Sequence, residues 1–134
     1  MFARPLALAA ILSLSALPAV AQTAPDWSAA QTVTVSMSNY AFAPATLNLK
    51  ANQTYKLVFT STVNKDHDFS APELFAAGTI APEDAGKVSK GVVEVDDGGT
   101  VDVRFMPTKP GTYNFTCDHF MHSMLGMHGQ AVVQ

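Results

Sequence analysis

The sequence predicts an all-β fold, a Greek-key β-sandwich of about seven to eight strands. Two observations indicate this class. Several segments of the 134-residue chain alternate apolar and polar residues, which is typical of strands with one buried face. Short runs rich in Gly, Pro and Asp separate these segments, and a helical pattern is confined to one turn within residues 72–77.

Three segments show the clearest alternation, and we expect them to form half-buried strands of an antiparallel sheet. Their apolar positions are Val33, Val35 and Met37, then Tyr55, Leu57 and Phe59, and finally Val101, Val103 and Phe105. Shorter strands are expected at residues 46–50, 91–95, 112–117 and 130–133. Residues 96–99 and 108–111 have the composition of tight turns between neighbouring strands.

The first 21 residues are typical of an export signal. Arg4 supplies one positive charge, an apolar run follows at residues 6–17, and residues 19–21 have the small side chains that a signal peptidase recognises. The apolar run is too short to span a bilayer as a helix. We therefore expect cleavage after Ala21 and a periplasmic location. The mature chain of about 113 residues would then consist of a flexible leader at 22–30 and one domain at 31–134.

Composition excludes several classes of function. The formal net charge is −3 at pH 7 and no cluster of basic residues occurs, so nucleic acid is not an expected partner. After signal cleavage we expect no membrane association, and we expect a monomer. The single cysteine cannot form an internal disulfide. No Ser-His-Asp order or phosphate-binding glycine loop is present, so we do not expect an enzyme.

A short segment near the C-terminus gathers residues that bind soft metal ions. The only cysteine, Cys117, is followed by His122 and then by Met127 at equal spacing. A thiolate, an imidazole and a thioether, together with one more imidazole, are the ligands of blue copper electron-transfer sites. His67, far upstream, is the candidate for the second imidazole. This combination predicts a copper site.

The position of Cys117 in its strand indicates that the sulfur faces the interior. Tyr113 and Phe115 are the large apolar residues of the strand at 112–117, and Cys117 has the same parity. The glycines at 126 and 129 allow the following loop to return into the last strand. The two other candidate ligands of this loop can then fold back over the sulfur.

This segment resembles the cupredoxins, the family that includes plastocyanin, pseudoazurin, azurin and auracyanin. The shared pattern is Cys-x-x-x-x-His-x-x-x-x-Met, preceded by Pro110-Gly-Thr-Tyr-Asn-Phe-Thr and followed by Gly129-Gln-Ala-Val-Val. The resemblance covers about residues 31–134 and implies one copper ion that cycles between Cu(I) and Cu(II). The metal ligands that it implies are His67, Cys117, His122 and, at a longer distance, Met127.

Three positions depart from the family pattern. Asp68 and Asp118 stand where the family usually has neutral residues, and Phe120-Met121 replaces a Pro-Gly before the loop histidine. In the family, the residues at the first two positions meet through a hydrogen bond that joins the ligand loops. We therefore expect one aspartate to have a raised pKa and to share a proton with the other. The alternative is that the pair turns toward solvent or toward Lys65.

Other histidines near the motif leave an alternative open. His119 could replace His122 as the ligand, but its closeness to the cysteine strains a chelate around one ion, and an exposed loop residue is the simpler interpretation. His128 directly follows Met127, and successive side chains in extended backbone point in opposite directions. His128 should therefore point away from the site.

The methionines support two interpretations. Met121, Met124 and Met127 are spaced so that their thioethers could gather around Cu(I). In the simpler interpretation, Met121, Met124 and Leu125 pack over the site or form an apolar docking patch.

Two functions therefore fit the sequence. The first is a single-electron carrier that contacts redox protein partners transiently. The second is a periplasmic copper chaperone or resistance protein that exchanges Cu(I) with donor and acceptor proteins through the Met- and His-rich loop. A copper enzyme is disfavoured, because a second copper centre needs more histidines than the four in this chain.

Overall fold

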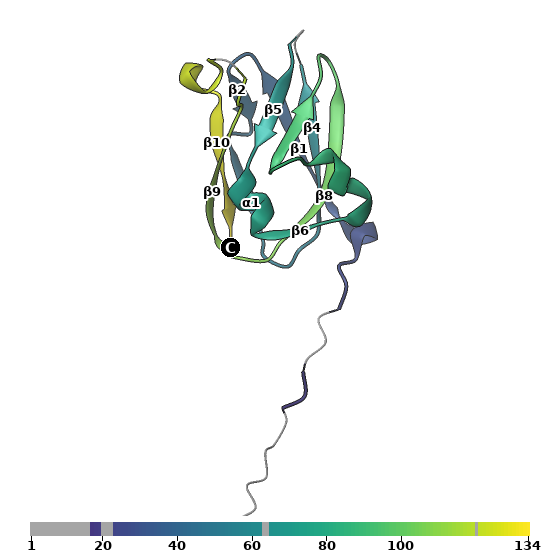
Figure 1. Cartoon of the computed structure of the whole chain (residues 1–134). Coiled ribbons are helices and arrows are strands. Elements are labelled where there is room, and N and C mark those ends of the chain that lie inside the picture. Colours follow the sequence, from purple (N-terminus) through teal and green to yellow (C-terminus); the bar gives the residue numbers. More distant parts are fainter. Residues whose placement is uncertain (1–16, 20–22, 63–64, 120) are drawn as a thin grey trace, which may run out of the picture.

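The computed structural model describes residues 17–19, 23–62, 65–119 and 121–134, which fold into a sandwich of two five-stranded sheets (Figure 1). The predicted export signal, apart from residues 17–19, lies outside the described residues, and so does Phe120. The strands are β1 (Gln31–Ser38), β2 (Ala41–Ala43), β3 (Thr46–Leu49), β4 (Tyr55–Ser61), β5 (His67–Ser70), β6 (Gly78–Ile80), β7 (Val92–Val95), β8 (Thr100–Pro107), β9 (Gly111–Thr116) and β10 (His128–Val133). The helices are α1 (Pro72–Ala76) and the 3₁₀ helices η1 (Trp27–Ala29), η2 (Pro82–Lys87) and η3 (Ser123–Leu125).

The strand order is β2-β1-β4-β8-β6 in one sheet and β3-β10-β9-β5-β7 in the other. The predicted all-β sandwich is thereby confirmed, with ten strands among the described residues rather than seven to eight. The strands that the sequence did not predict are β2 and β6, which have three residues each, and β5. All four residues of β5 are buried, so this strand has no alternation to detect.

The expectation of purely antiparallel pairing is wrong at two places. Strand β1 pairs with β4 in parallel, with Val35 beside Phe59, and β10 pairs with β3 in parallel, with Ala131 beside Leu47. Between β1 and β4 the chain forms β3 in the opposite sheet. Strand β4 therefore enters through a crossover and not through a hairpin, which makes a parallel pair possible.

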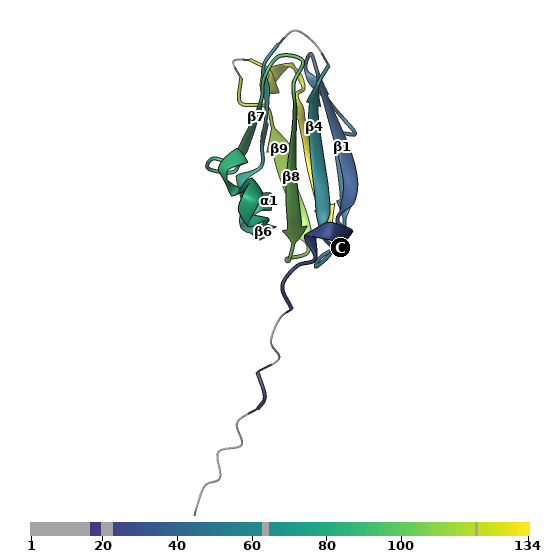
Figure 2. The same ribbon diagram turned by 90° about the vertical axis from the view of Figure 1, so that its right-hand side faces the viewer.

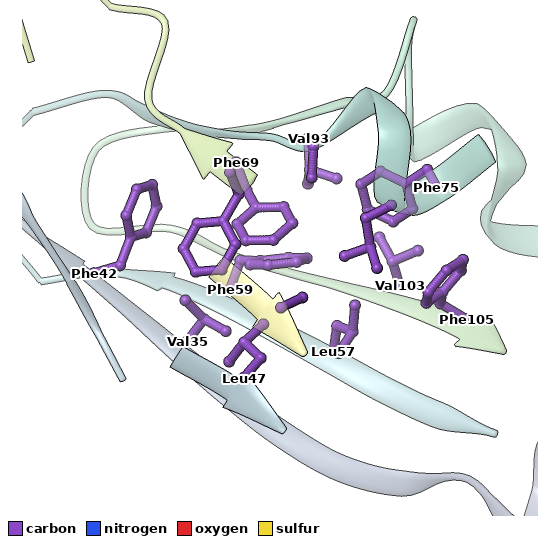
Figure 3. Packing of buried hydrophobic residues seen from close by; sticks show 14 of the residues in the cluster. Val35, Phe42, Leu47, Leu57, Phe59, Phe69, Phe75, Val93, Val103 and Phe105 are labelled. Carbon is purple, nitrogen blue, oxygen red and sulfur yellow. The ribbon is translucent and has the colours of Figure 1, made fainter. Parts of the chain in front are cut away.

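Apolar side chains from both sheets meet in one core between them (Figure 3). The inward positions predicted for β1, β4 and β8 are confirmed, since Val35, Leu57 and Phe105 are fully buried. The ring centroids of Phe59 and Phe69 are 4.5 Å apart, and those of Phe69 and Phe115 are 4.7 Å apart, as in favourable aromatic pairs. Cys117 and Met127 belong to the same buried cluster, so the predicted metal ligands adjoin the rigid core.

Both ends of the domain lie at one end of the sandwich, and the loop that carries η3 lies at the other (Figures 1 and 2). At the first end, the hydroxyl of Thr54 donates to the carbonyl of Asp26 at 3.0 Å, beside η1. The backbone N–H of Gln134 donates to the carbonyl of Leu49 at 2.9 Å. No helix in the described ranges is long and apolar enough to cross a membrane.

Candidate metal centre

Neighbouring strands of the second sheet bring the first histidine to the cysteine. His67 is the first residue of β5, and Cys117 directly follows β9. These two strands are hydrogen-bonded neighbours, with Ser70 paired to Thr116. Ser70 is the last residue of β5 and Thr116 the last of β9, so the antiparallel β5 extends past the end of β9, and its first residue lies beside the segment that follows β9. Two residues fifty positions apart in the sequence therefore meet at one end of the sheet.

The loop after Cys117 closes on itself through backbone hydrogen bonds. The N–H of Cys117 donates to the carbonyl of Met127 at 3.2 Å, and the N–H of Met127 donates to the carbonyl of His122 at 3.0 Å. Gly126 ends η3 with a φ of 98°, a left-handed conformation that glycine adopts without strain. The loop thus fixes the backbone of all three of its predicted ligands.

Gly129 explains how β10 can pass so close to the strand that leads to the cysteine. A Cβ atom at this position would lie 2.4 Å from the carbonyl oxygen of Ala45 and 2.4 Å from the ring of Phe115. Only glycine allows this approach, and it places Met127, two residues earlier, over the end of β9.

The donor atoms of three of the four predicted ligands converge. The Sγ atom of Cys117 lies 3.9 Å from Nδ1 of His67 and 3.3 Å from Nδ1 of His122. One donor atom of each of these three residues lies within 4.8 Å of the other two. Cys117, His67 and Met127 are fully buried, and His122 is 8% exposed. His67, the candidate for the second imidazole, therefore lies at the cysteine, with its Nδ1 toward the sulfur.

These distances fit a metal ion held by the three side chains. Metal–nitrogen bonds of about 2.0 Å and metal–sulfur bonds of about 2.3 Å place a sulfur and a nitrogen about 3.6 to 3.8 Å apart across one ion. The two observed Sγ–Nδ1 distances lie on either side of that range. With Met127 buried in the same cluster, the arrangement of His67, Cys117, His122 and Met127 is typical of a type 1 copper site.

The local environment prepares the donors for a metal. Burial, together with the neighbouring His122, lowers the pKa of His67, and burial lowers the pKa of His122. Both imidazoles are therefore neutral at pH 7 and have a free lone pair. Burial raises the pKa of the Cys117 thiol, so binding of a metal as thiolate would release a proton.

His67 differs from an ordinary core histidine in one respect, a buried ring nitrogen that has no hydrogen-bond partner. Its Nε2 atom is the single buried side-chain nitrogen or oxygen without a hydrogen-bond partner in the part of the chain that the structure describes. A histidine kept in a core for structural reasons normally has its polar atoms paired. The ring of His67 is instead directed through Nδ1 at the sulfur, which is the contact that a ligand role requires.

Asp68 joins the two segments that carry the ligands. Its backbone N–H donates to Sγ of Cys117 at 3.5 Å, and its Oδ1 accepts the backbone N–H of Asp118 at 2.8 Å. Burial raises the pKa of Asp68 to about 6; the N–H of Asp118 opposes this, and the charges of Asp118 and Glu94 add to it. The predicted raised pKa is therefore found at one of the two aspartates.

The predicted sharing of a proton between the aspartates is not found. The side chain of Asp118 is exposed, and its Oδ1 accepts the hydroxyl of Thr116 at 3.0 Å. Asp68 remains buried; its Oδ1 accepts the backbone N–H of Asp118, and its Oδ2 lies 3.8 Å from Nε2 of His119. Lys65 lies over the ring of Tyr40, with its Nζ 5.8 Å from the ring centroid. Because the two carboxylates bond different groups, they do not act as a pair.

The remaining soft residues of the loop lie outside the cluster. His128 is exposed, as predicted. Met121, Met124 and Leu125 are 44%, 80% and 50% exposed, which favours the interpretation of a surface patch. The Nε2 atom of His119 lies 3.1 Å from Oε2 of Glu94.

Glu94 is a residue near the site that the sequence did not reveal. The alternation of β7 predicts that its side chain faces outward, between Val93 and Val95. Its position opposite Asp68 depends on the pairing of β7 with β5, and β5 itself was not predicted. No signal in the sequence defines that register.

Solved structures with the same fold include three auracyanins. The dithionite-reduced auracyanin of Roseiflexus castenholzii is 21% identical, with 79% of this chain and 98% of that chain covered and a TM-score of 0.57. Auracyanin B is 23% identical, with 86% and 94% covered and a TM-score of 0.58. Auracyanin A of Chloroflexus aurantiacus, described as a "blue" copper protein, is 20% identical, with 77% and 99% covered and a TM-score of 0.54. At these identities the likeness shows the fold.

A comparison with curated protein sequences gave no match. The family whose description is cupredoxin-like domain matches residues 6–133, which is most of the chain. That match agrees with the two-sheet sandwich and with the cluster of one cysteine, two histidines and one methionine at its end. The chain belongs to the cupredoxin-like domain family.

Proposed function

We propose that this protein binds one copper ion through His67, Cys117, His122 and Met127 and carries single electrons between redox proteins. The observation that supports the proposal best is the buried sulfur of Cys117 between two imidazole Nδ1 atoms, at 3.9 and 3.3 Å. Bound copper would supply the redox chemistry, by alternating between Cu(I) and Cu(II). No second group of histidines is present for an enzymatic copper centre, since the chain has only four.

The chain's contribution is a site whose shape is set before a metal binds. His67 is held by β5, and Cys117 is held by the backbone bond to Met127 and accepts the N–H of Asp68. Because these contacts belong to the sheet and the loop backbone, a change of charge at the site would move few atoms. A small rearrangement is the condition for rapid electron transfer, and burial of the thiolate keeps water and oxidants away from it.

The surface around His122 supports contact with a protein partner. His122 is the ligand nearest to solvent, and it lies next to the exposed side chains of Met121, Met124 and Leu125. The ring of Tyr40 packs edge-on against the His122 ring, with centroids 5.4 Å apart. We infer that a redox partner approaches at this apolar patch in a small and transient interface. The auracyanin neighbours are consistent with a carrier role.

The proposal includes export to the periplasm after cleavage following Ala21, and action as a monomer. Its support is the charged, apolar and small-residue pattern of residues 1–21. A lone cysteine in an oxidising compartment requires protection, and Cys117 is fully buried.

A second function, delivery or storage of Cu(I), is favoured by one observation. The thioethers of Met121 and Met124 are exposed beside the site, where a soft ion could be passed to another protein. In this case the loop would bind more than one Cu(I) and the protein would remain colourless.

Anaerobic copper titration followed by visible and paramagnetic resonance spectra tests both functions. A carrier binds one copper per chain, shows an intense thiolate-to-Cu(II) band, and has a reversible reduction potential. Several colourless Cu(I) ions per chain would instead support delivery. A chain that binds no copper would contradict both.

A further inference from the structure

A second group of metal-binding side chains lies beside the first but shares no residue with it. The group consists of Asp68, Glu94 and His119, and one donor atom of each lies within 4.8 Å of the other two. Nε2 of His119 lies 3.1 Å from Oε2 of Glu94 and 3.8 Å from Oδ2 of Asp68. The three residues come from β5, from β7 and from the loop after β9.

The strand register places two carboxylates directly opposite each other. Asp68 on β5 pairs with Glu94 on β7, so their side chains lie on the same face of the sheet. Like charges in this relation destabilise a sheet unless something positive lies between them. Asp68 is also nine-tenths buried, which makes its charge more costly.

The residues that the structure describes supply no strong cation to this pair. Among the described residues, His119 is the only basic residue within ion-pair distance of either carboxylate. Lys90 and Asp118 line the same pocket, whose volume is about 500 Å³, but Lys90 makes no ion pair with the two acids in the described part of the chain. The pocket is therefore an open space with an imidazole and three carboxylates on its wall, two of which are those of Asp68 and Glu94.

The donor set identifies the class of ion that fits. An imidazole and two carboxylates suit divalent ions such as Zn²⁺, whereas Cu(I) prefers sulfur and Mg²⁺ or Ca²⁺ prefer oxygen alone. Bonds of about 2.0 to 2.2 Å to zinc place a nitrogen and an oxygen about 3.4 Å apart. The two His119 distances lie on either side of this value, and the exposed side chain of Glu94 can adjust.

We propose that Asp68, Glu94 and His119 form a second metal site, which binds one zinc-like divalent cation in the pocket between β5, β7 and the loop after β9. The carboxylates supply two oxygen ligands, Nε2 of His119 supplies the nitrogen, and water completes the coordination from the open side.

This second site is coupled to the first through two neighbouring residues. Asp68 directly follows His67, and the ring of His119 stacks on that of His122 with centroids 5.7 Å apart and planes at 24°. A divalent cation held there adds positive charge next to the first site, which favours Cu(I) over Cu(II) and raises the reduction potential. This coupling rests on the proposed copper site, whereas the second site itself does not.

Calorimetric titration with Zn²⁺ tests the site. The chain is first loaded with one equivalent of copper, the visible band is recorded, and excess metal is removed. We expect one Zn²⁺ to bind per chain, and we expect Glu94→Gln and His119→Ala each to weaken that binding at least tenfold. His128→Ala and Glu73→Gln are matched controls, since neither residue belongs to the group or lines its pocket, and both variants should bind Zn²⁺ as the unchanged chain does.

Two outcomes would overturn the site. In one, the copper-loaded chain takes up no Zn²⁺, which would show that His119 and Glu94 form only a surface ion pair. In the other, Zn²⁺ binds equally well to Glu94→Gln and His119→Ala. Absence of the visible band before any zinc is added would instead contradict the proposed copper function, so the two failures are distinguishable.

The coupling has its own measurement. The reduction potential of the copper-loaded chain should rise when Zn²⁺ is added, and the rise should disappear in Glu94→Gln, since Glu94 is not one of the residues of the first site. An unchanged potential in a chain that has demonstrably bound Zn²⁺ would refute the coupling.

Discussion

The backbone N–H of Asp118 donates a hydrogen bond of 2.8 Å to Oδ1 of Asp68, and this bond joins the two segments that carry the metal ligands. Asp68 follows His67 and Asp118 follows Cys117, so the bond fixes the spacing of those two ligands. Since an acceptor oxygen is all that the bond requires, the charge of Asp68 and its structural role can be separated by mutation.

Asp68→Asn keeps the acceptor oxygen and removes the negative charge. We expect the variant to retain the fold and the copper, with a raised reduction potential because less negative charge stabilises Cu(II). Asp68→Ala removes the acceptor as well and should lower the free energy of unfolding by about 1 to 3 kcal/mol. Voltammetry and denaturant unfolding measure the two effects. Asp118→Asn is the control, since that side chain is exposed; a larger shift of potential there than in Asp68→Asn would contradict this assignment.

Cys117→Ser should remove the blue colour completely. The visible band arises from charge transfer between a thiolate and Cu(II), and serine has no sulfur to supply it. Visible absorption of the copper-loaded variant measures the effect. His128→Ala, an exposed position beside the loop, should keep the full band. If the serine variant retained the band, the thiolate role of Cys117 would be wrong.

Met127→Leu should keep the fold and the copper but raise the reduction potential, because the weak axial thioether tunes the site and does not hold it. Met127 is fully buried, and exchange for a side chain of similar volume should cost less than about 1.5 kcal/mol of unfolding free energy. Voltammetry and thermal unfolding test the two statements together. Loss of copper in this variant would show that Met127 is an essential ligand.

Asp84, remote from the metal centre, should make the protein sensitive to acid. Its buried carboxylate lies 2.8 Å from Nε of Arg104 and 2.8 Å from Nζ of Lys87. Burial raises the pKa of Asp84, but the bonds from Arg104 and Lys87 outweigh burial and hold the pKa well below its ordinary value of 3.8. Because the pKa of Asp84 is lower in the folded chain than in the unfolded chain, the ionised carboxylate stabilises the fold at pH values above its ordinary pKa of 3.8. This stabilisation is lost as the pH falls below that value and the carboxylate becomes protonated.

Asp84→Asn should therefore be less stable than the unchanged chain at pH 7, by about 1 to 3 kcal/mol, with a smaller further loss between about pH 4 and pH 2. Denaturant unfolding at a series of pH values measures both. Asp102→Asn is a suitable control, because its half-exposed carboxylate lies 3.8 Å from the same lysine, and its stability should change little. Parallel pH profiles for Asp84→Asn and the unchanged chain would contradict this role.

The sequence predicted those features that are local in the chain. Val35, Leu57 and Phe105 are buried as their alternation indicated, because a strand with one buried face records its orientation in every second residue. Cys117, His122 and Met127 are confined to one loop, so their spacing alone indicates that they can meet. His67 was found because the chemistry of the site requires a second imidazole, and the chain has few histidines.

Features that depend on contacts between distant segments could not be predicted. The parallel pairing of β1 with β4 results from a crossover through the other sheet, which leaves no local pattern. The pairing of Asp68 with Glu94 depends on the register of a strand whose residues are all buried. Asp68 and Asp118 likewise form different hydrogen bonds, because Asp68 is buried and Asp118 is exposed. Each follows a predicted metal ligand in the sequence, and that position does not indicate which of the two is buried.

The placement of both ends of the domain opposite the η3 loop has a practical consequence for attachment (Figure 1). A linker to an electrode, a fluorescent label or a fusion partner joined near Thr23 or after Gln134 would leave from the end remote from the η3 loop, which begins next to His122. Such a tether would orient the molecule with its apolar patch outward, so that a redox partner in solution could reach it. Immobilised through either end, the protein should exchange electrons with soluble partners as readily as the free chain does.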